Sequence, residues 1–498
     1  MNNSNLCTEL QSSININAHQ ISSALAPYDS TTATYAWLDT LRAIEDCINL
    51  VTIDWEDDAF EQQLFSLPLA PLLHDPRPLL ALRLRLITRF SETFANRFTN
   101  LMVQSSAIAH GFAALGLFQM SVELATVGAA IGYFQSRRRH FVALLHSLPN
   151  ECRGRQKVVP LDALNIILPI IEMNALQIVG AQQALLIEAA RERLGLAHAQ
   201  SLEIAMLDGL FLDPERSRIT EMPVTKQGMA ILGTREPQPT DRLFSAAELR
   251  NDIVVIEAAY AEFDLAATEF GPAAELVRRI SREYVERDFW VAIKPRRLEA
   301  LFDALNVPQA LRAALLPPPA GYNSSLETYA PFVLVDGTYR STVSLLSRFV
   351  YYWRMRCLDK RKRFQIRTGF IFEKAVAAAL EAQGFSDQKI TRINRHEFDV
   401  VALRNGAIWN VQCKNNFIDL EWVQADSKRF AKYNHSLVRL YERALTKERN
   451  REDILTAHLS IDTIQHMVVS RFPVVTDNAR IIPFSRIGEF AKRVDALL

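Results

Sequence analysis

The chain has 498 residues, in which 56 Lys and Arg balance 56 Asp and Glu, so its formal net charge is zero. Hydrophobic residues make up 49% and charged residues 22% of the sequence. This composition excludes a disordered or collagen-like chain, and the length suffices for roughly three domains. A zero net charge also excludes a chain that is basic throughout, so contact with nucleic acid would depend on local basic segments.

The N-terminal residues, about 1–30, are rich in Ser, Asn and Thr and are predicted to form a loosely ordered lead-in. They contain no basic start followed by an apolar run, so we expect no secretory signal and a cytoplasmic location. The five cysteines are far apart and include no CxxC pair. This spacing argues against a disulfide framework and against a cysteine zinc site.

Residues 31–213 are predicted to form a helical domain, because apolar residues recur at three- and four-residue intervals. Within it, Ala114–Phe134 is long enough to span a bilayer and is followed by three arginines, Arg137 to Arg139. Gln119 and Glu123 lie near its middle, where a carboxylate costs about 2.5–3.5 kcal/mol on insertion. We therefore expect a helix buried among other helices, with the arginines at a solvated helix end. A membrane span is the less favoured alternative.

Residues 214–243 are rich in Pro and Gly and are predicted to be a linker or loop, and residues 244–345 a second, mainly helical segment. The histidines of the helical two-thirds share no metal-ligand spacing. This part of the chain therefore indicates a scaffold, self-association into a homo-oligomer, or target recognition, but no chemistry.

Residues 346–498 are predicted to form a separate domain that opens with a basic segment interleaved with aromatic residues. Such a segment suits a phosphate backbone, with aromatic rings available for stacking. The alternative interpretation is an ordinary solvated helix face. The candidate nucleic-acid-binding residues are Arg354, Arg356, Lys360, Arg361, Lys362, Arg363 and Arg367.

The next predicted helix carries a carboxylate on its apolar face. Phe370, Val376 and Leu380 are spaced to face inward, and Glu373 lies within the same stripe. Gly384 resembles a glycine cap that ends this helix. Because a buried carboxylate is costly unless it is paired or holds a metal, Glu373 needs a partner.

A predicted hairpin follows, with strands at 396–403 and 408–415 and an Asn-Gly turn at Asn405. Asp399 lies on the first strand. Gln412 and Lys414 share one face of the second strand, while Cys413 points to the other side. We expect Asp399, Gln412 and Lys414 to converge near one end of a sheet, within reach of Glu373.

This arrangement resembles the PD-(D/E)xK nuclease superfamily over about residues 360–485. The family's helix acid matches Glu373, and its strand aspartate matches Asp399, preceded here by Phe398 in place of proline. Gln412-Cys413-Lys414 is similar to the QxK variant of Mrr-like type IV restriction endonucleases. The resemblance implies a multidomain chain whose mainly α-helical N-terminal region is joined to a restriction-endonuclease-like α/β domain, a helix followed by a mixed central sheet with helices on both faces.

The resemblance also implies an Mg²⁺-dependent (or Mn²⁺-dependent) endonuclease that hydrolyses DNA, with RNA not excluded, in restriction or antiviral defence. Asp399, Gln412 and Glu373 would hold the metal, since hard cations prefer oxygen ligands. Lys414 would orient or deprotonate the attacking water and stabilise developing charge. The alternative is a catalytically inactive nuclease fold that binds DNA or assembles with partners through the helical region.

Overall fold

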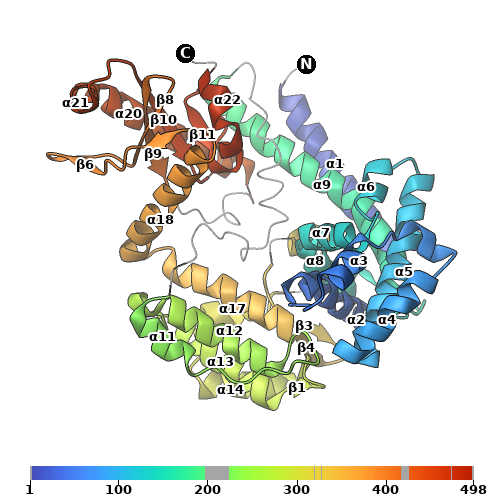
Figure 1. The fold of residues 1–498 in the computed structure, drawn as a ribbon. Coiled ribbons are helices and arrows are strands. Elements are labelled where there is room, and N and C mark those ends of the chain that lie inside the picture. The colour runs from blue at the N-terminus through green and yellow to red at the C-terminus, as the bar shows by residue number, and fades with distance from the viewer. Residues whose placement is uncertain are drawn as a thin grey trace.

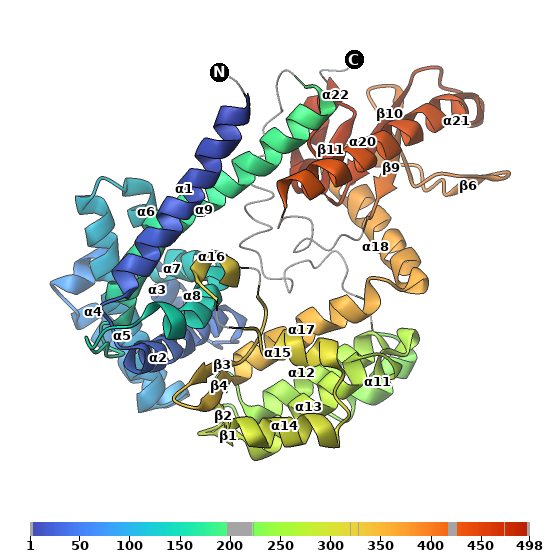
Figure 2. The ribbon, with the colours of Figure 1, turned by 180° about the vertical axis from the view of Figure 1, so that it is seen from behind.

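The computed structural model describes residues 3–196, 222, 224–318, 320–326, 328–416, 426–472 and 474–495. These residues form three parts arranged around a common centre (Figure 1, Figure 2). The first is a set of N-terminal helices, the second a helical part with a small sheet, and the third a C-terminal sheet with its own helices. The expected multidomain chain, helical first and α/β at its C-terminal end, is confirmed at this level.

The N-terminal part begins with a helix, so the expected loose lead-in is wrong. Ile14, Ile21 and Leu25 are spaced by seven and four residues, lie on one face of that helix and are buried. Polar residues such as Ser12, Asn15 and Ser23 are exposed on its other faces, which is why composition alone suggested a loose segment. The helices are α1 (Asn3–Leu25), α2 (Ser30–Asn49), α3 (Asp58–Ser66), α4 (Arg77–Arg89), α5 (Glu92–Ala114), α6 (Phe118–Val122), α7 (Val127–Ser136), α8 (Arg138–Glu151) and α9 (Ala163–Leu194).

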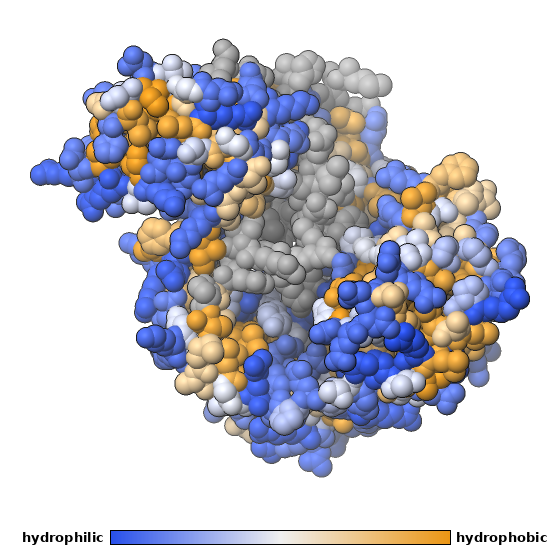
Figure 3. Space-filling view, in the orientation of Figure 1, coloured by the Kyte–Doolittle hydropathy of each residue, from blue (hydrophilic) through white to orange (hydrophobic). Residues whose placement is uncertain are grey.

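The stretch Ala114–Phe134 is not one buried helix, contrary to the sequence-based expectation. α5 ends at Ala114, Gly116 adopts a positive φ of 76°, and the Thr126 side chain caps a new helix by accepting from the Ala129 N–H. The intervening α6 has no buried residue. Figure 3 shows apolar patches among the polar surface of these N-terminal helices.

The three arginines that follow are not a solvated helix end either. Arg137 contacts Glu172 and Glu123, and Arg138 pairs with Glu45 at 2.7 Å. The carboxylates come from α2, α9 and the segment after α6, and nothing in the local sequence indicates them. The one described helix long and apolar enough to cross a membrane is instead α9; half of its most apolar stretch is buried, and it packs against α1 and α20 (Ser427–Arg449).

The middle part contains a four-stranded antiparallel sheet, which corrects the mainly helical expectation for residues 244–345. The strands have two to five residues each, too short to show a period in the sequence. They are β1 (Val285–Glu286), β2 (Trp290–Ile293), β3 (Val333–Val335) and β4 (Thr338–Thr342), in the order β1-β2-β4-β3.

Helices surround this sheet, and one of them lies in the expected linker. Residues 214–221 and 223 lie outside the described residues, but the rest of the segment 214–243 contains α11. The helices of the middle part are α11 (Lys226–Leu232), α12 (Ala246–Ala259), α13 (Phe270–Glu283), α14 (Pro295–Ala304), α15 (Gln309–Leu315), α16 (Tyr322–Ser325) and α17 (Val343–Leu358).

The predicted domain boundary at residue 346 is wrong, because α17 belongs to the middle part. Its Leu346, Phe349 and Trp353 are buried in the same core as α12 and α13. The next helix, α18 (Lys362–Glu381), starts in that core with Phe364 and continues into the core of the C-terminal sheet with Phe372. The boundary therefore runs through α18.

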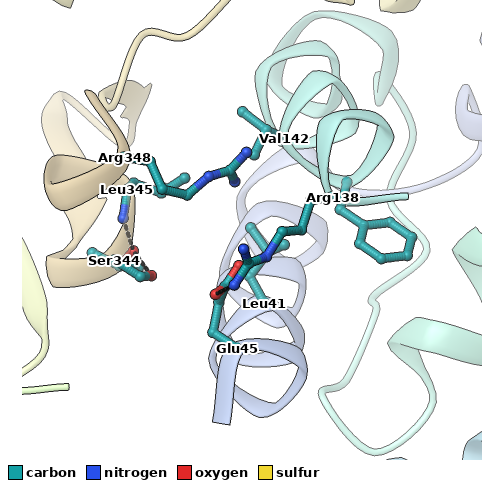
Figure 4. Close-up of a pocket in the computed structure, with 9 residues that line it drawn as sticks. Leu41, Glu45, Arg138, Val142, Ser344, Leu345 and Arg348 are labelled. Atoms are coloured by element: carbon teal, nitrogen blue, oxygen red, sulfur yellow. Dashed lines mark hydrogen bonds and ion pairs between the residues drawn. The ribbon is translucent and has the colours of Figure 1, made fainter. Parts of the chain in front are cut away.

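A small space marks the junction of α2, α8 and α17 (Figure 4). Glu45 of α2 and Arg138 of α8 pair beside it, and Arg348 of α17 points toward the same place. Its volume of about 10 Å³ leaves room for one water molecule at most. The N-terminal and middle parts therefore pack directly against each other here.

The C-terminal sheet is mixed. β5 (Ser386–Asp387), β8 (Val400–Arg404) and β9 (Ala407–Lys414) are antiparallel, and β10 (Ile464–Ser470) and β11 (Ile481–Pro483) continue from β9 in parallel. α18 packs on the face that carries Val411 and Val469, and α20 on the face that carries Val468. The sheet is therefore covered by helices on both faces. The remaining elements are β6 (Arg392–Ile393), β7 (His396–Glu397), α21 (Glu452–Leu459) and α22 (Phe490–Asp495).

Candidate active site

The hairpin that carries three of the four candidate residues forms as predicted, with one correction. Asn405 and Gly406 have φ values of 52° and 73°, as a type I′ turn requires, and Val400 pairs with Val411. The first strand is shorter than expected, because β7 ends at Glu397 and β8 begins at Val400. Asp399 therefore lies in the bend just before β8 rather than inside a strand.

At this end of the hairpin, the Asp399 side chain accepts a hydrogen bond that a backbone carbonyl would accept in a continuous pair of strands. Its Oδ2 accepts the backbone N–H of Cys413 at 2.7 Å, just past the Val400–Val411 pair. This bond ties the carboxylate to β9, the strand that carries Gln412 and Lys414. Asp399 thus has a structural role as well as a candidate chemical one.

A buried ion pair fixes the segment that leads into Asp399. Arg451 donates to the Glu397 carbonyl at 2.9 Å, and its guanidinium lies 4.7 Å from the centre of the Phe398 ring. Glu448, which is 1% exposed, pairs with Arg451 and accepts from Asn410 of β9 at 2.8 Å. The network therefore joins α20, β9 and the residues before β8.

Gln412 and Lys414 contact each other, as their shared strand face predicts. The Lys414 ammonium donates to Gln412 Oε1 at 3.0 Å. Cys413 packs instead on the α18 side of the sheet with Val411 and Val376, which confirms that it points the other way. Burial raises the pKa of the Cys413 thiol well above its usual range, which disfavours the thiolate form.

Glu373 of α18 lies near Asp399 and Lys414, whose charges affect its pKa, although the apolar face of that helix was misassigned. The buried row is Phe364, Thr368, Phe372, Val376 and Leu380, and Phe370 is 53% exposed. Glu373 is half-buried beside Phe372, at the edge of this row. α18 ends as predicted, because Gly384 adopts a φ of 83° and Phe385 N–H donates to the Leu380 carbonyl at 3.2 Å.

The electrostatics indicate a shortage of positive charge. Burial raises the pKa of Glu373 to about 7, with the nearby Asp399 carboxylate adding to the rise and Lys414 opposing it. Burial also raises the pKa of Asp399, and Lys414 again opposes the rise. Two partly desolvated carboxylates thus share the Lys414 ammonium, and Arg451 adds only a small effect on Asp399. A divalent cation would relieve this excess of negative charge.

The donor set fits a sparsely ligated hard cation. The described residues contain no group of three or more His, Cys, Asp or Glu side chains placed to hold a metal. Asp399, Glu373 and the Gln412 carbonyl oxygen nevertheless offer two carboxylates and one amide oxygen. Mg²⁺ commonly binds through one or two carboxylates and completes its shell with water and substrate phosphate.

Several polar residues near Lys414 were missed from the sequence. Arg471 follows β10, its backbone N–H donates to the Lys414 carbonyl at 3.0 Å, and its guanidinium donates to Asn415 at 3.2 Å. Tyr441 of α20 donates to Asn416 at 3.2 Å and accepts from Ser470. A signal existed: parallel neighbours β9 and β10 end at the same edge, so the residues after each strand must meet.

The predicted basic segment divides into buried and exposed members. Arg354 is 8% exposed and lies 4.7 Å from the Tyr260 ring centre, so it is part of the core of the middle part and its assignment to nucleic acid is wrong. Arg361 donates to the Phe263 carbonyl at 2.7 Å and joins the same packing. Arg363 and Arg367 lie 3.8 and 3.6 Å from Glu262. The exposed members are Arg356, Lys360, Lys362, Arg363 and Arg367.

No family model, curated protein or solved structure matches this chain.

Proposed function

We propose that the C-terminal part is a metal-dependent nuclease of the PD-(D/E)xK type, resembling the Mrr-like QxK branch, that hydrolyses DNA phosphodiester bonds. The observation that carries this proposal is that Asp399, Gln412 and Lys414 lie at one edge of a mixed sheet, with Glu373 near enough to Asp399 and Lys414 for both to affect its pKa. A role in restriction or defence, and a cytoplasmic location, belong to the same proposal and rest on the resemblance and on the sequence.

In this proposal Asp399 and Glu373, with Gln412 Oε1, hold Mg²⁺ or Mn²⁺. When bound, the cation polarises a phosphoryl oxygen and lowers the pKa of the attacking water. Lys414 stands beside Gln412 and supplies a positive charge for the oxygens of the pentacovalent transition state. Because Glu373 loses its proton as the pH rises through its pKa of about 7, the site gains negative charge, and metal affinity should rise over that range.

The exposed cations of α18 and the residues before it are the proposed contacts to the nucleic-acid backbone. Lys362, Arg363 and Arg367 lie in the first turns of the helix that carries Glu373. A single rigid helix therefore relates the phosphate contacts to the site. DNA is the favoured partner by resemblance, and RNA remains an alternative substrate.

A second candidate function is a nuclease fold without catalysis that serves in DNA binding or assembly. Gln412 favours it, because a neutral amide stands where the commoner pattern has a carboxylate, and the candidate set contributes only two acidic side chains. The two functions differ in one measurable property, which is cleavage at saturating metal.

The test is cleavage of duplex DNA, single-stranded DNA and RNA by the full chain with Mg²⁺, Mn²⁺ or EDTA. Asp399→Asn keeps an acceptor for the Cys413 N–H but removes the charge, so it should fold normally and lose at least about 100-fold in rate. Lys414→Ala should lose a similar factor while still binding metal. Asp453→Asn, an exposed aspartate on α21, is the matched control and should cleave as the wild type does.

The outcomes separate the two candidates. Metal-dependent cleavage that both Asp399→Asn and Lys414→Ala abolish supports the nuclease. A wild type that binds DNA but cleaves none of the three substrates supports the inactive fold. Undiminished cleavage by both variants, in protein free of contaminating nuclease, would show that Asp399 and Lys414 are not catalytic residues.

A further inference from the structure

A cavity of about 650 Å³ lies between the N-terminal helices and the β1–β2 hairpin of the middle part. Its size falls in the range of small-molecule sites and is far larger than the one-water space of Figure 4. The residues that matter for its chemistry are Asp39, Arg42, Arg97, Arg242, Arg287 and Trp290. None of them belongs to the proposed nuclease site.

The lining carries more positive than negative charge. Four arginines line the cavity, against two aspartates, Asp39 and Asp241. Burial raises the pKa of Asp39, and the nearby Arg97 and Arg287 oppose the rise. Arg242 pairs with Asp241, whereas Arg97 pairs with Asp46, which lies outside the lining. The excess of guanidinium groups favours an anionic ligand.

Arg42 contributes a donor that the protein does not satisfy. Its Nε pairs with Asp46 at 3.0 Å, its Nη2 donates to the Leu243 carbonyl at 2.7 Å, and its guanidinium stacks 3.7 Å from the Phe289 ring centre. The Nη1 is buried and has no hydrogen-bond partner among the described residues, although the whole residue is only 5% exposed. A buried donor without an acceptor is unusual in a folded protein, and this one belongs to a residue that lines the cavity.

Arg287 is held at the cavity by a tight turn. Arg287 and Asp288 both adopt positive φ, 49° and 58°, which non-glycine residues rarely do in succession. Asp288 is fixed because its carboxylate accepts the Ala246 N–H at 2.9 Å and pairs with Arg242. Arg287 is exposed and makes no hydrogen bond or ion pair with any described residue. The turn therefore presents a guanidinium that remains available for an anion.

We propose that this cavity binds a nucleotide, with its phosphates on the arginines and its base against Trp290. Arginine forks match phosphate oxygens in pairs, and the indole ring offers a flat apolar surface for a base. Asn100 of α5, which also lines the cavity, supplies an amide donor and acceptor for the sugar and base edges, and Asn96 supplies a donor, because its Oδ1 already accepts from Arg83. The assignment does not depend on the nuclease proposal.

The test is calorimetric titration of the full chain, in EDTA, with ATP, GTP, CTP and UTP. At least one of these should bind, and adenosine and pyrophosphate should each bind at least tenfold more weakly than the best triphosphate. Arg287→Ala should weaken that binding at least tenfold. Arg297→Ala, an exposed arginine of α14 outside the lining, is the matched control and should bind as the wild type does. Asp399→Asn should also bind normally, which separates this cavity from the nuclease site.

Binding of none of the four triphosphates would overturn the proposal. Equal affinity of the wild type and Arg287→Ala would overturn it as well, because the available guanidinium would then contact nothing. If pyrophosphate binds as tightly as the best triphosphate, the base contributes nothing to binding. Trp290 then has no role, and the ligand is not a nucleotide.

Discussion

Buried acidic side chains of the N-terminal helices and of the C-terminal sheet differ in the number of positively charged partners that they have. Asp46, which is 1% exposed, accepts from Arg97 at 2.6 Å and pairs with Arg42 at 3.0 Å. At the edge of the sheet, Glu373 and Asp399 share the Lys414 ammonium, and Arg451 has a smaller effect on Asp399 alone. Asp46 thus has two guanidinium partners, whereas Glu373 and Asp399 share the Lys414 ammonium and repel each other. Burial of a charge is therefore not informative by itself, but the balance of its partners is.

Glu172 and Glu373 sharpen this contrast, because burial is the largest influence on both. The pKa of each carboxyl is raised, yet Glu172 receives hydrogen bonds from the Tyr133 hydroxyl and from Arg137. The second largest influence on the pKa of Glu373 is instead the negative charge of Asp399. Hydrogen-bond donors thus stabilise the charged form of Glu172, whereas the negative charge of Asp399 disfavours the charged form of Glu373.

The largest effect on stability should come from removing the Asp46 carboxylate. Asp46→Asn leaves two arginines without their shared carboxylate in a buried place and should cost about 3–5 kcal/mol of unfolding free energy. Asp399→Asn, measured without divalent metal, should cost less than about 1 kcal/mol or stabilise, because it removes one of two adjacent carboxylates. Thermal unfolding of both variants checks this, with the exposed Asp54→Asn as control. Equal losses for Asp46→Asn and Asp399→Asn would remove the distinction between the two regions.

The next effect concerns nucleic-acid binding. Replacing the exposed Lys360, Lys362 and Arg363 with Ala should weaken binding to all sequences by roughly tenfold or more and lower the salt slope by up to about 3. Fluorescence anisotropy over a range of salt concentrations measures both. Arg354→Ala should instead destabilise the fold, because that side chain packs on Tyr260. An unchanged salt slope in the triple variant would mean that the segment is an ordinary solvated helix face and does not contact nucleic acid.

The third prediction concerns metal affinity at the proposed site, which Gln412→Glu should raise. A third carboxylate beside Lys414 adds negative charge where Mg²⁺ is proposed to bind, so the metal affinity should tighten by about tenfold. Calorimetric titration with Mg²⁺ measures the change, and Gln62→Glu on the exposed face of α3 is the control. No tightening would mean that the Gln412 oxygen lies outside the metal shell.

The smallest effect is a pH dependence of stability that Glu373 controls. Its folded pKa of about 7 lies above the unfolded value of 4.5, so the folded state binds the extra proton, and metal-free stability should fall as the pH rises from about 4.5 to 7. The half-exposed position limits the effect to about 1 kcal/mol. Glu373→Gln should remove this part of the pH dependence, and unfolding midpoints at pH 5 and 8 in EDTA measure it. The same slope in variant and wild type would contradict the assignment.

Local features of the site were predictable, whereas its support was not. The Asn405-Gly406 turn, the Gly384 cap and the shared face of Gln412 and Lys414 follow from the preferences of a few adjacent residues. Phe370 was misassigned because the apolar residues of α18 fit two neighbouring stripes, and only tertiary packing selects the one through Phe372. The Glu448–Arg451 network was missed because its partners are far apart in sequence.

The fold shows the same division. The helices were predicted from periodicity, and the mixed sheet was implied by the family resemblance. However, α1 was hidden by its polar composition, and α17 was assigned to the wrong part. Basic residues such as Arg354 appear the same in the sequence whether they stack on a ring or face solvent. Their burial depends on which helix covers them, and the local sequence does not carry that information.

The continuity of α18 restricts how this chain can change in length. Phe364 is anchored in the middle core and Phe372 in the core of the sheet, with uninterrupted helix between them. Each residue inserted or deleted between these anchors would turn one end of the helix by roughly 100° relative to the other and shift it by about 1.5 Å. Glu373 would then leave Asp399 and Lys414 even though no residue of the site had been altered. Over evolution this helix should tolerate substitutions on its outer face but resist insertions and deletions, whereas the surface loops accept them.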